Sequence, residues 1–221
     1  GIGQVIDNKS QHVVALIGDS TFFHTGIQPI INLVKNNTNA LVLILDNYYS
    51  SMTGHQISPS TPEGKKEPHN KPIRVEKIIR SLGDFPLSFF DGYNLSKMKK
   101  GFLNMFEKPG VKFIIVKAEC RLIVSKERKK NRKKFMNEYP SDSFPETTYY
   151  ISDHCTKCNE CFERLGCTAI QMMNDQYYID ESRCLGERCG SCIEICPNNA
   201  IYRTVINPHF NIKKTKEDEK L

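Results

Sequence analysis

Eight of the nine cysteines are gathered in two similar groups in the last third of the chain. Each group places three cysteines close together with a fourth nearby: Cys155, Cys158, Cys161 and Cys167, then Cys184, Cys189, Cys192 and Cys196. Such spacing suits a cubane-type iron–sulfur cluster. In the cysteine pattern of bacterial proteins that hold two clusters, the fourth cysteine of one group ligates the cluster of the other group. The pattern predicts two [4Fe-4S] clusters with crossed ligands, one on Cys155, Cys158, Cys161 and Cys196, the other on Cys184, Cys189, Cys192 and Cys167.

Zinc and disulfides are the alternatives for these thiols. Zinc sites usually take paired CxxC ligands separated by a longer stretch, which fits a third nearby cysteine poorly. A disulfide framework is typical of small secreted domains, and the chain shows no signal-peptide pattern at its start. We therefore favour iron–sulfur chemistry and expect a cytoplasmic protein. Cys120 stands alone after a predicted strand and is interpreted as a buried structural thiol.

Two segments in the first half of the chain carry hard oxygen ligands. Gly18-Asp19-Ser20 follows one apolar run, and Asp46-Asn47 follows another. Carboxylate and amide oxygens are ligands that Mg²⁺ takes, with phosphate and water completing its octahedron. A glycine at position 18 would let the backbone approach a diphosphate closely. Taken alone this pattern is weak, because two ordinary strand-end turns would look the same.

Residues 12–118 must supply the elements that position these groups. Apolar runs typical of buried strands alternate with helical patterns: strands at 12–17, 41–45, 87–90 and 111–116, and helices at 27–34, 73–82 and 95–106. This alternation predicts an α/β domain with a doubly wound parallel sheet covered on both faces. Ligands of such sheets bind at the carboxyl ends of the strands, which here means after Ile17 and after Leu45.

Charge and composition divide the rest of the chain. The net charge is +6, and seven of the nine residues from 126 to 134 are basic. We interpret this run as a solvated helix or linker, with docking of an acidic electron carrier as the alternative. Nucleic-acid binding is not expected, because no groove-reading motif accompanies the run. The longest aliphatic run, 40–45, is far below the ~20 residues of a membrane span. We expect domains at 1–120 and 151–206, a basic helix and linker at 121–150, and a disordered tail at 207–221.

Three motifs together resemble a known family: GDSTFFHTG at 18–26, ILDN at 44–47 and MTGHQ at 52–56. They resemble the thiamine diphosphate-binding domain of the 2-oxoacid:ferredoxin oxidoreductases, and most of all the large (alpha) subunit of indolepyruvate:ferredoxin oxidoreductase. In that family the thiamine domain is followed by a small α+β two-cluster ferredoxin-like domain. The two domains have the same order here, so the resemblance covers roughly 1–206. Thr168 departs from the pattern by replacing a proline, and both cysteine groups carry extra residues.

The resemblance implies roles for individual residues. Mg²⁺ would be held by the Asp19 and Asn47 side chains and the Tyr49 carbonyl. The diphosphate would lie against Gly18 and Ser20. The loop over the reactive end of the cofactor would be formed by Thr53, Gly54, His55 and Gln56, with His55 and Gln56 as candidate catalytic groups. His24 is expected at the start of a helix, as a structural residue or as an anion contact.

The resemblance also implies an activity: oxidative decarboxylation of a 2-oxoacid, of the indolepyruvate or aryl pyruvate kind, to acyl-CoA. The cofactors would be thiamine diphosphate, Mg²⁺ and two [4Fe-4S] clusters, and electrons would pass to an external ferredoxin. The expected partners are a pyrimidine-domain chain or a missing N-terminal half, and a small beta/gamma-type subunit. Three alternatives remain: a pyruvate or 2-oxoglutarate-type enzyme, suggested by Ser58-Pro59-Ser60-Thr61-Pro62; a non-catalytic electron-transfer module; and a zinc-containing nucleic-acid binder.

Overall fold

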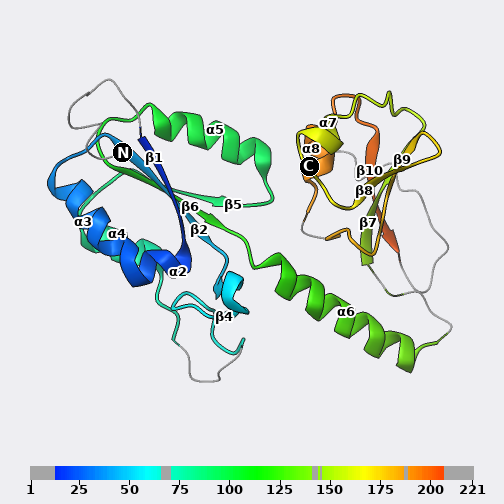
Figure 1. Cartoon of the computed structure of the whole chain (residues 1–221), viewed down its shortest axis with the longest axis horizontal. Helices are drawn as coiled ribbons and strands as arrows, with labels where there is room; N and C mark the ends of the chain where they lie inside the picture. Colours follow the sequence, from blue (N-terminus) through cyan, green and yellow to red (C-terminus); the bar gives the residue numbers. More distant parts are fainter. Residues whose placement is uncertain (1–12, 66–70, 141–143, 145, 187–188, 207–221) are drawn as a thin grey trace. The chain divides into compact units, whose positions relative to one another are not determined.

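The computed structural model describes residues 13–65, 71–140, 144, 146–186 and 189–206 (Figure 1). The chain divides into two compact units, 1–123 and 124–221. The boundary falls in the first turn of helix α6 (Arg121–Glu138), close to the predicted end of the first domain at residue 120. Each unit is described by itself.

The first unit contains a four-stranded parallel sheet with the strand order β1-β2-β6-β5. Its strands are β1 (Val13–Gly18), β2 (Ala40–Asp46), β5 (Leu87–Asp91) and β6 (Lys112–Lys117). Strands β2 and β6 are central and mostly buried, as expected for mainly apolar runs in a parallel sheet. The structure thus confirms the predicted α/β sheet.

Helices cover both faces of this sheet (Figure 1). On one face, Phe22, Ile30 and Ile79 from the segments after β1 and before β5 pack against apolar side chains of β2 and β6. On the other face, Met105 packs against Leu41 and the inner strands. Phe22 lies in the π-helical segment η1 (Phe22–Gly26). The other side chains come from α3 (Ile27–Lys35) and α4 (Val75–Ser81) on the first face and from α5 (Leu95–Phe106) on the second.

The helix after β1 begins earlier than its apolar pattern indicates. The sequence predicts a helix over 27–34, but α2 (Asp19–Thr21), the π-helical segment η1 (Phe22–Gly26) and α3 follow one another without interruption from Asp19 to Lys35. A π turn is wider than an α turn, so it interrupts the 3.6-residue pattern by which helices are recognised. The helix therefore starts at the end of β1.

The segment after β2 contains a small hairpin. Strands β3 (Tyr49–Ser50) and β4 (Gln56–Ile57) pair antiparallel around a 3₁₀ turn, η2 (Ser51–Thr53). Gly54 and His55 have φ values of 113° and 62°, the left-handed conformation that closes this turn.

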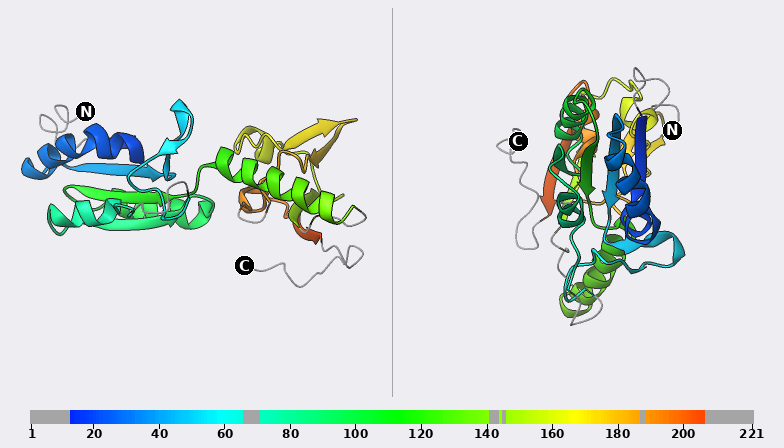
Figure 2. Two further views of the ribbon diagram at one scale, coloured as in Figure 1. Left: turned by 90° about the horizontal axis from the view of Figure 1, so that it is seen from below. Right: turned by 90° about the vertical axis from the view of Figure 1, so that its left-hand side faces the viewer.

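The second unit contains two short antiparallel pairs, β7 with β10 and β8 with β9. The β8–β9 hairpin is drawn in yellow in Figure 2. The core of the second unit combines Tyr149, Ile170 and Ile201 with buried cysteines. The elements after α6 are β7 (Glu146–Ile151), α7 (Glu160–Glu163), β8 (Ile170–Met173), β9 (Gln176–Ile179), α8 (Ser191–Ile195) and β10 (Ile201–Ile206).

Strand β7 differs from the predicted division of the chain. Residues 146–150 were expected in a linker, yet they form most of a strand that pairs with β10 at the far end of the cysteine region. Thr147, Thr148 and Tyr149 are buried there, so this segment belongs to the second unit. The predicted tail at 207–221 lies outside the described residues. Among the helices that the structure describes, none has the length and apolar composition of a membrane span.

Candidate functional site

The carboxyl ends of β1 and β2 bring two aspartates into one buried site. The two strands are neighbours in register, with Gly18 opposite Leu45, so the residues that follow them lie at the same edge of the sheet. Asp19 is 2% exposed and Asp46 is 3% exposed. Two carboxylates buried at one sheet edge form a strongly anionic site, which is what a divalent cation stabilises.

Ser60 joins these two carboxylates. Its Oγ lies 3.1 Å from Oδ2 of Asp19 and 2.8 Å from Oδ1 of Asp46. Burial raises the pKa of Asp46 to about 6; the hydrogen bond from Ser60 opposes the shift and the neighbouring Asp19 adds to it. The sequence pattern indicates Ser60 only as part of the segment 58–62 and does not indicate Asp46 as its buried partner. The proline-rich segment that follows MTGHQ was the available signal.

Asn47 and Tyr49 lie in the turn that follows β2. The Oδ1 of Asn47 accepts a hydrogen bond from the Tyr49 backbone N–H at 3.0 Å. Among the described residues, no three His, Cys, Asp or Glu side chains converge where a single metal ion could sit. The predicted Mg²⁺ set of Asp19, Asn47 and the Tyr49 carbonyl instead combines one carboxylate with an amide and a backbone oxygen, a mixture that Mg²⁺ accepts.

Gly18 leaves open space at the end of β1. Its backbone is extended, with φ of −81°, and a Cβ built there would meet no atom within 4 Å. Neither backbone strain nor packing therefore requires a glycine at this position. A helical segment starts at Asp19, directly after this strand end, and the start of a helix is a favourable position for a phosphate. The open space at Gly18 fits the close approach of a diphosphate.

The MTGHQ loop is held beside this position. Ser20 Oγ lies 2.7 Å from Ser50 Oγ, which ties the first helical turn to the hairpin. Within the loop, Thr53 Oγ1 donates to Gln56 Oε1 at 2.7 Å, and Gln56 Nε2 donates to the Thr53 carbonyl at 2.6 Å. The His55 N–H donates to the Ser50 carbonyl at 3.1 Å. The predicted loop residues are thus brought together near Ser20, with the Gln56 amide engaged by Thr53.

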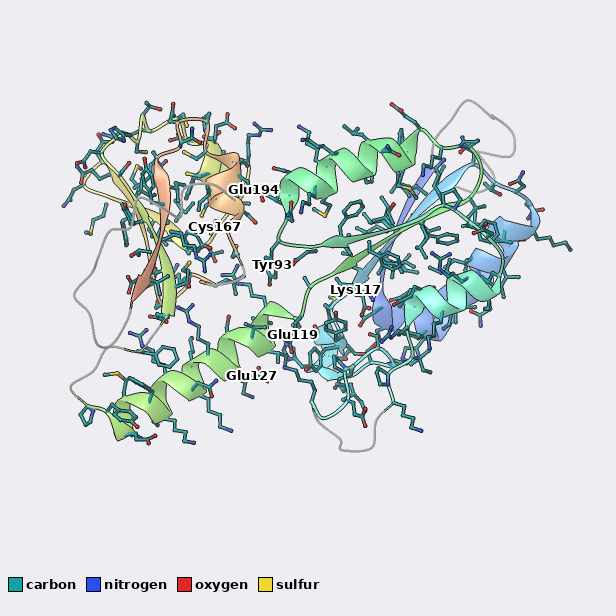
Figure 3. All side chains as sticks on the ribbon, turned by 180° about the vertical axis from the view of Figure 1, so that it is seen from behind. Tyr93, Lys117, Glu119, Glu127, Cys167 and Glu194 are labelled. Carbon is teal, nitrogen blue, oxygen red and sulfur yellow. The ribbon has the colours of Figure 1, made fainter. Side chains whose placement is uncertain are left out.

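Contacts beyond β6 support the same hairpin. The Tyr49 hydroxyl donates to Oε1 of Glu119 at 3.5 Å, and Lys65 forms an ion pair with Glu119 at 2.9 Å. Glu119 is labelled in Figure 3, just past Lys117 at the end of β6. His24 is exposed and lies within the π-helical segment, not at the helix start as expected, because the helix begins at Asp19.

The first predicted set of cluster ligands lines one cavity in the second unit. Cys155, Cys158, Cys161 and Cys196 all face it, together with apolar side chains that include Ile151 and Tyr177. Burial raises the pKa of the Cys161 thiol, and Cys196, Cys155 and Cys158 raise it further. The structure therefore brings Cys196, from the second group in sequence, to the first group.

The second predicted set is gathered around Cys192. Burial raises the pKa of this thiol to about 12, with Cys189, Cys167 and Cys184 as the neighbouring groups that add to the shift. Cys167, labelled in Figure 3, comes from the first group in sequence. Thiols with raised pKa values stay protonated at neutral pH unless a metal deprotonates them. Each iron of a cubane takes one thiolate, so four thiolates around a shared space fit such a cluster.

Several cysteine sulfurs accept hydrogen bonds from nearby amides. Sγ of Cys184 accepts from the Gly186 N–H at 3.4 Å, and Sγ of Cys196 accepts from the Ala200 N–H at 3.3 Å. The Asn198 side-chain amide lies 3.7 Å from Sγ of Cys158. Hydrogen bonds to ligand sulfurs are one of the means by which proteins set cluster potentials.

Two further residues hold the loop of the second set, and no sequence pattern indicates either role. Tyr149 is buried on β7 and donates its hydroxyl hydrogen bond to the Cys189 carbonyl. Burial raises the Tyr149 pKa to about 12, which keeps the phenol a donor. Arg128 Nη1 donates to the Cys184 carbonyl at 2.5 Å. Arg128 lies 56 residues from Cys184 in the sequence, and Tyr149 lies 40 residues from Cys189, so no local motif could have identified these contacts.

Comparison with known proteins agrees with this geometry. The model of the C-terminal TPP binding domain of thiamine pyrophosphate enzymes matches residues 1–116. Subunit IorA of indolepyruvate oxidoreductase from Archaeoglobus fulgidus is 34% identical to this chain, and the match covers 91% of this chain and 30% of the relative. The same subunit from Pyrococcus abyssi is 31% identical, and the match covers 86% of this chain and 28% of the relative. The chain thus spans about 30% of the length of these relatives.

A solved 2-oxoglutarate:ferredoxin oxidoreductase from Magnetococcus marinus superposes with a TM-score of 0.44 at 15% identity, covering 54% of this chain and 43% of that one. The match to the domain model extends over more than half of the chain and includes Asp19, Asn47 and the MTGHQ loop. The chain therefore belongs to the thiamine pyrophosphate enzymes that carry this C-terminal TPP binding domain, and along most of its length it is similar to the IorA subunit of indolepyruvate oxidoreductases.

Proposed function

We propose that this chain is part of a 2-oxoacid:ferredoxin oxidoreductase, in which it holds the diphosphate end of thiamine diphosphate and carries electrons away through two [4Fe-4S] clusters. The observation that supports this most directly is the combination, in one chain, of the Asp19–Asn47 sheet edge and two crossed sets of four cysteines. The names of the similar IorA subunits make indolepyruvate or a related aryl 2-oxoacid the proposed substrate.

The first unit's residues would bind and orient the cofactor. Asp19, Asn47 and the Tyr49 carbonyl would hold Mg²⁺, and the diphosphate would lie in the open space at Gly18. Thiamine diphosphate, when bound, supplies the carbanion stabilisation that decarboxylation of a 2-oxoacid requires. Thr53 and Gln56 form two hydrogen bonds with each other, and these bonds hold the loop that carries His55 in one conformation. We propose that His55 and Gln56 contact the reacting groups.

The second unit's residues would hold the electron acceptors. Cys155, Cys158, Cys161 and Cys196 would ligate one cluster, and Cys184, Cys189, Cys192 and Cys167 the other. Apolar side chains pack against several of these cysteines, and the amide hydrogen bonds to sulfur would add to the control of the cluster potential. Two clusters in one small unit give electrons a path to an external ferredoxin.

The partners belong to the same proposal. Thiamine enzymes place a carboxylate against the pyrimidine ring of the cofactor, and we propose that a separate chain or a preceding segment supplies it. A small beta/gamma-type subunit, coenzyme A and ferredoxin complete the proposed assembly, which we place in the cytoplasm.

A second substrate class is favoured by the segment after MTGHQ. Ser58, Ser60 and Thr61 are all buried beside the sheet edge, and this serine- and proline-rich segment was the feature that resembled the pyruvate and 2-oxoglutarate enzymes. Assaying the assembled complex with indolepyruvate, pyruvate and 2-oxoglutarate separates the two classes. The aryl proposal requires the highest kcat/KM with indolepyruvate.

Anaerobic purification tests the cofactors. We expect a brown protein that contains iron and sulfide and binds thiamine diphosphate in a Mg²⁺-dependent manner once its partner chains are present. Asp19→Ala should abolish that binding while the iron content stays unchanged. A protein that keeps its clusters and binds no thiamine diphosphate would be an electron-transfer module, and a colourless zinc protein would contradict the whole proposal.

A further inference from the structure

Helix α6 presents a face of exposed lysines. Positive side chains dominate its middle, and none of the five lysines there forms an ion pair within the described part of the chain: Lys126, Lys129, Lys130, Lys133 and Lys134. At about 100° per residue, these five positions fall within an arc of about 140° on one side of the helix. The charge is therefore concentrated on one face.

The opposite face of α6 anchors the helix to the second unit. Arg128 forms an ion pair with Glu146 at the start of β7, and Arg132 lies 3.6 Å from the same carboxylate. Phe135 packs edge-on against Phe144, with ring centroids 5.6 Å apart. These anchoring residues lie on the helix side away from the lysines, so the lysine face is left for solvent or for a partner.

The anchor also connects the helix to the loop of the second cysteine set. Arg128 Nη1 donates to the carbonyl of Cys184, a proposed cluster ligand, at 2.5 Å. A Cβ on the adjacent Gly186 would lie 3.3 Å from the same Nη1, which shows how closely the guanidinium packs on this loop. Helix α6 is thus hydrogen-bonded directly to the loop that would bear the second cluster. The lysine face is on the other side of this helix, about one helix diameter from that loop.

We propose that this lysine face, defined by the five lysines above, is the docking surface for an acidic one-electron carrier protein that takes its electron from the cluster held by Cys184. The proposal rests on the function proposed above, because the reduced cluster must supply the electron. One electron passes from the reduced cluster to the oxidised carrier, and no bond or proton is exchanged. Clustered charge accelerates such encounters by steering the partner onto the surface.

The position of the helix favours an electron carrier over a nucleic acid. A transient redox complex needs only a small interface, together with a short path to the donor. The contact between Arg128 and Cys184 provides that short path, whereas binding of a phosphate backbone would make no use of it. Nucleic-acid binding is therefore kept as an outcome of the test.

The test compares two charge reversals in the full chain with its clusters. One variant carries Lys129→Glu, Lys130→Glu and Lys133→Glu. Its control carries Lys97→Glu, Lys99→Glu and Lys100→Glu on α5, where the lysines are also exposed and the charge change is the same. Each protein is reduced chemically and mixed rapidly with an oxidised, acidic ferredoxin or with a small uncharged acceptor.

We expect the second-order rate to ferredoxin at low salt to fall at least about tenfold in the α6 variant and to stay unchanged in the α5 control. Transfer to the uncharged acceptor should be equal in all three proteins. The wild-type rate to ferredoxin should fall steeply with added salt, and the α6 variant should lose that dependence.

Equal rates in the wild type and the α6 variant would overturn the docking proposal, as would equal losses in both variants. Binding of DNA or RNA that the α6 variant alone loses, with ferredoxin reduction retained, would also overturn it. If the wild type holds no reducible clusters at the start of the trace, the proposed function itself fails, so the two failures are distinguishable.

Discussion

The hydroxyl of Ser60 lies 2.8 Å from Oδ1 of Asp46 and joins the segment after the MTGHQ loop to the end of β2. The same oxygen is 3.1 Å from Asp19, the proposed Mg²⁺ ligand. A serine hydroxyl has a single hydrogen, so it can donate fully to only one of the two carboxylates at a time. The direction of the Ser60 hydroxyl therefore decides which of the two mutually repelling carboxylates receives the hydrogen bond.

Replacing Ser60 by alanine should weaken Mg²⁺ binding. The change removes a donor from two buried carboxylates and should cost about 1.5–3 kcal/mol of unfolding free energy, as for hydrogen bonds to charged groups. Mg²⁺-dependent binding of thiamine diphosphate to the assembled complex should weaken about tenfold, because Asp19 loses its orientation. Calorimetric titration with Mg²⁺ at saturating cofactor measures the effect. Ser60→Thr, which keeps the hydroxyl, should keep the wild-type Mg²⁺ affinity.

Thr38→Val is the matched control for this prediction. Thr38 is buried in the same unit, and its Oγ1 has no hydrogen-bond partner among the described residues. Removing that hydroxyl should leave both stability and Mg²⁺ affinity unchanged or slightly improved. Equal Mg²⁺ affinities in Ser60→Ala and the wild type would show that Ser60 has no positioning role.

The raised pKa of Asp46 predicts a pH dependence of stability without bound metal. The pKa is about 6 in the folded protein against 3.8 for the free side chain. Between these values the folded state binds the proton more tightly, so the contribution of this group to stability falls as pH rises through the window and is constant above it. From pH 5 to pH 7 the loss should be about 1 kcal/mol.

Asp46→Asn should remove this component. We expect denaturant unfolding of the variant to show about 1 kcal/mol less destabilisation between pH 5 and pH 7 than the wild type. The exposed Asp84→Asn should retain the wild-type pH dependence. Identical pH profiles for Asp46→Asn and the wild type would contradict a raised pKa at this site.

Two glycines in the first unit should respond differently to alanine. Gly18→Ala should change the unfolding free energy by less than about 0.5 kcal/mol, because its backbone is extended and the added methyl meets no atom within 4 Å. It should nevertheless abolish thiamine diphosphate binding, since the methyl would occupy the proposed diphosphate space.

Gly26→Ala should instead destabilise the fold. Its Cβ would lie 2.8 Å from Ile17 Cδ1 and 3.2 Å from the Thr21 carbonyl oxygen, in a tightly packed core where overpacking costs about 1–3 kcal/mol. Thermal unfolding together with cofactor binding measures both variants. Unimpaired binding by Gly18→Ala would exclude a diphosphate at that position.

Crossed ligation predicts a specific pattern of iron loss in double variants. Cys161→Ser/Cys196→Ser removes two ligands of the same proposed cluster, so it should lose about half of the iron, as either single variant does. Cys192→Ser/Cys196→Ser removes one ligand from each cluster and should lose nearly all of it. Iron and sulfide analysis, with electron paramagnetic resonance of the reduced proteins, measures the difference. The reverse pattern would show that each group in sequence ligates its own cluster.

The sheet of the first unit was predictable because its strands are mainly apolar runs, such as the aliphatic run 41–45, which predict buried strands without knowledge of their neighbours. The helix start at Asp19 was not predictable in the same way. A π turn interrupts the apolar period there, and the close packing of Gly26 against Ile17 that accommodates it is a tertiary contact. The strand at Glu146–Ile151 was missed because only its pairing with β10 makes it part of a sheet.

Residue types and their spacing were sufficient to select the two sets of thiols, Asp19, Asn47 and the MTGHQ loop as the candidate ligands and catalytic groups, since each is a local pattern of ligands or donors. Tertiary structure alone decided which groups meet. It placed Ser60 between Asp19 and Asp46, and it set Arg128 and Tyr149 on the loop of the second cysteine set. The reason is physical: burial and hydrogen bonding join residues far apart in the chain, and the raised pKa of Asp46 and the direction of the lysine face arise only from those contacts.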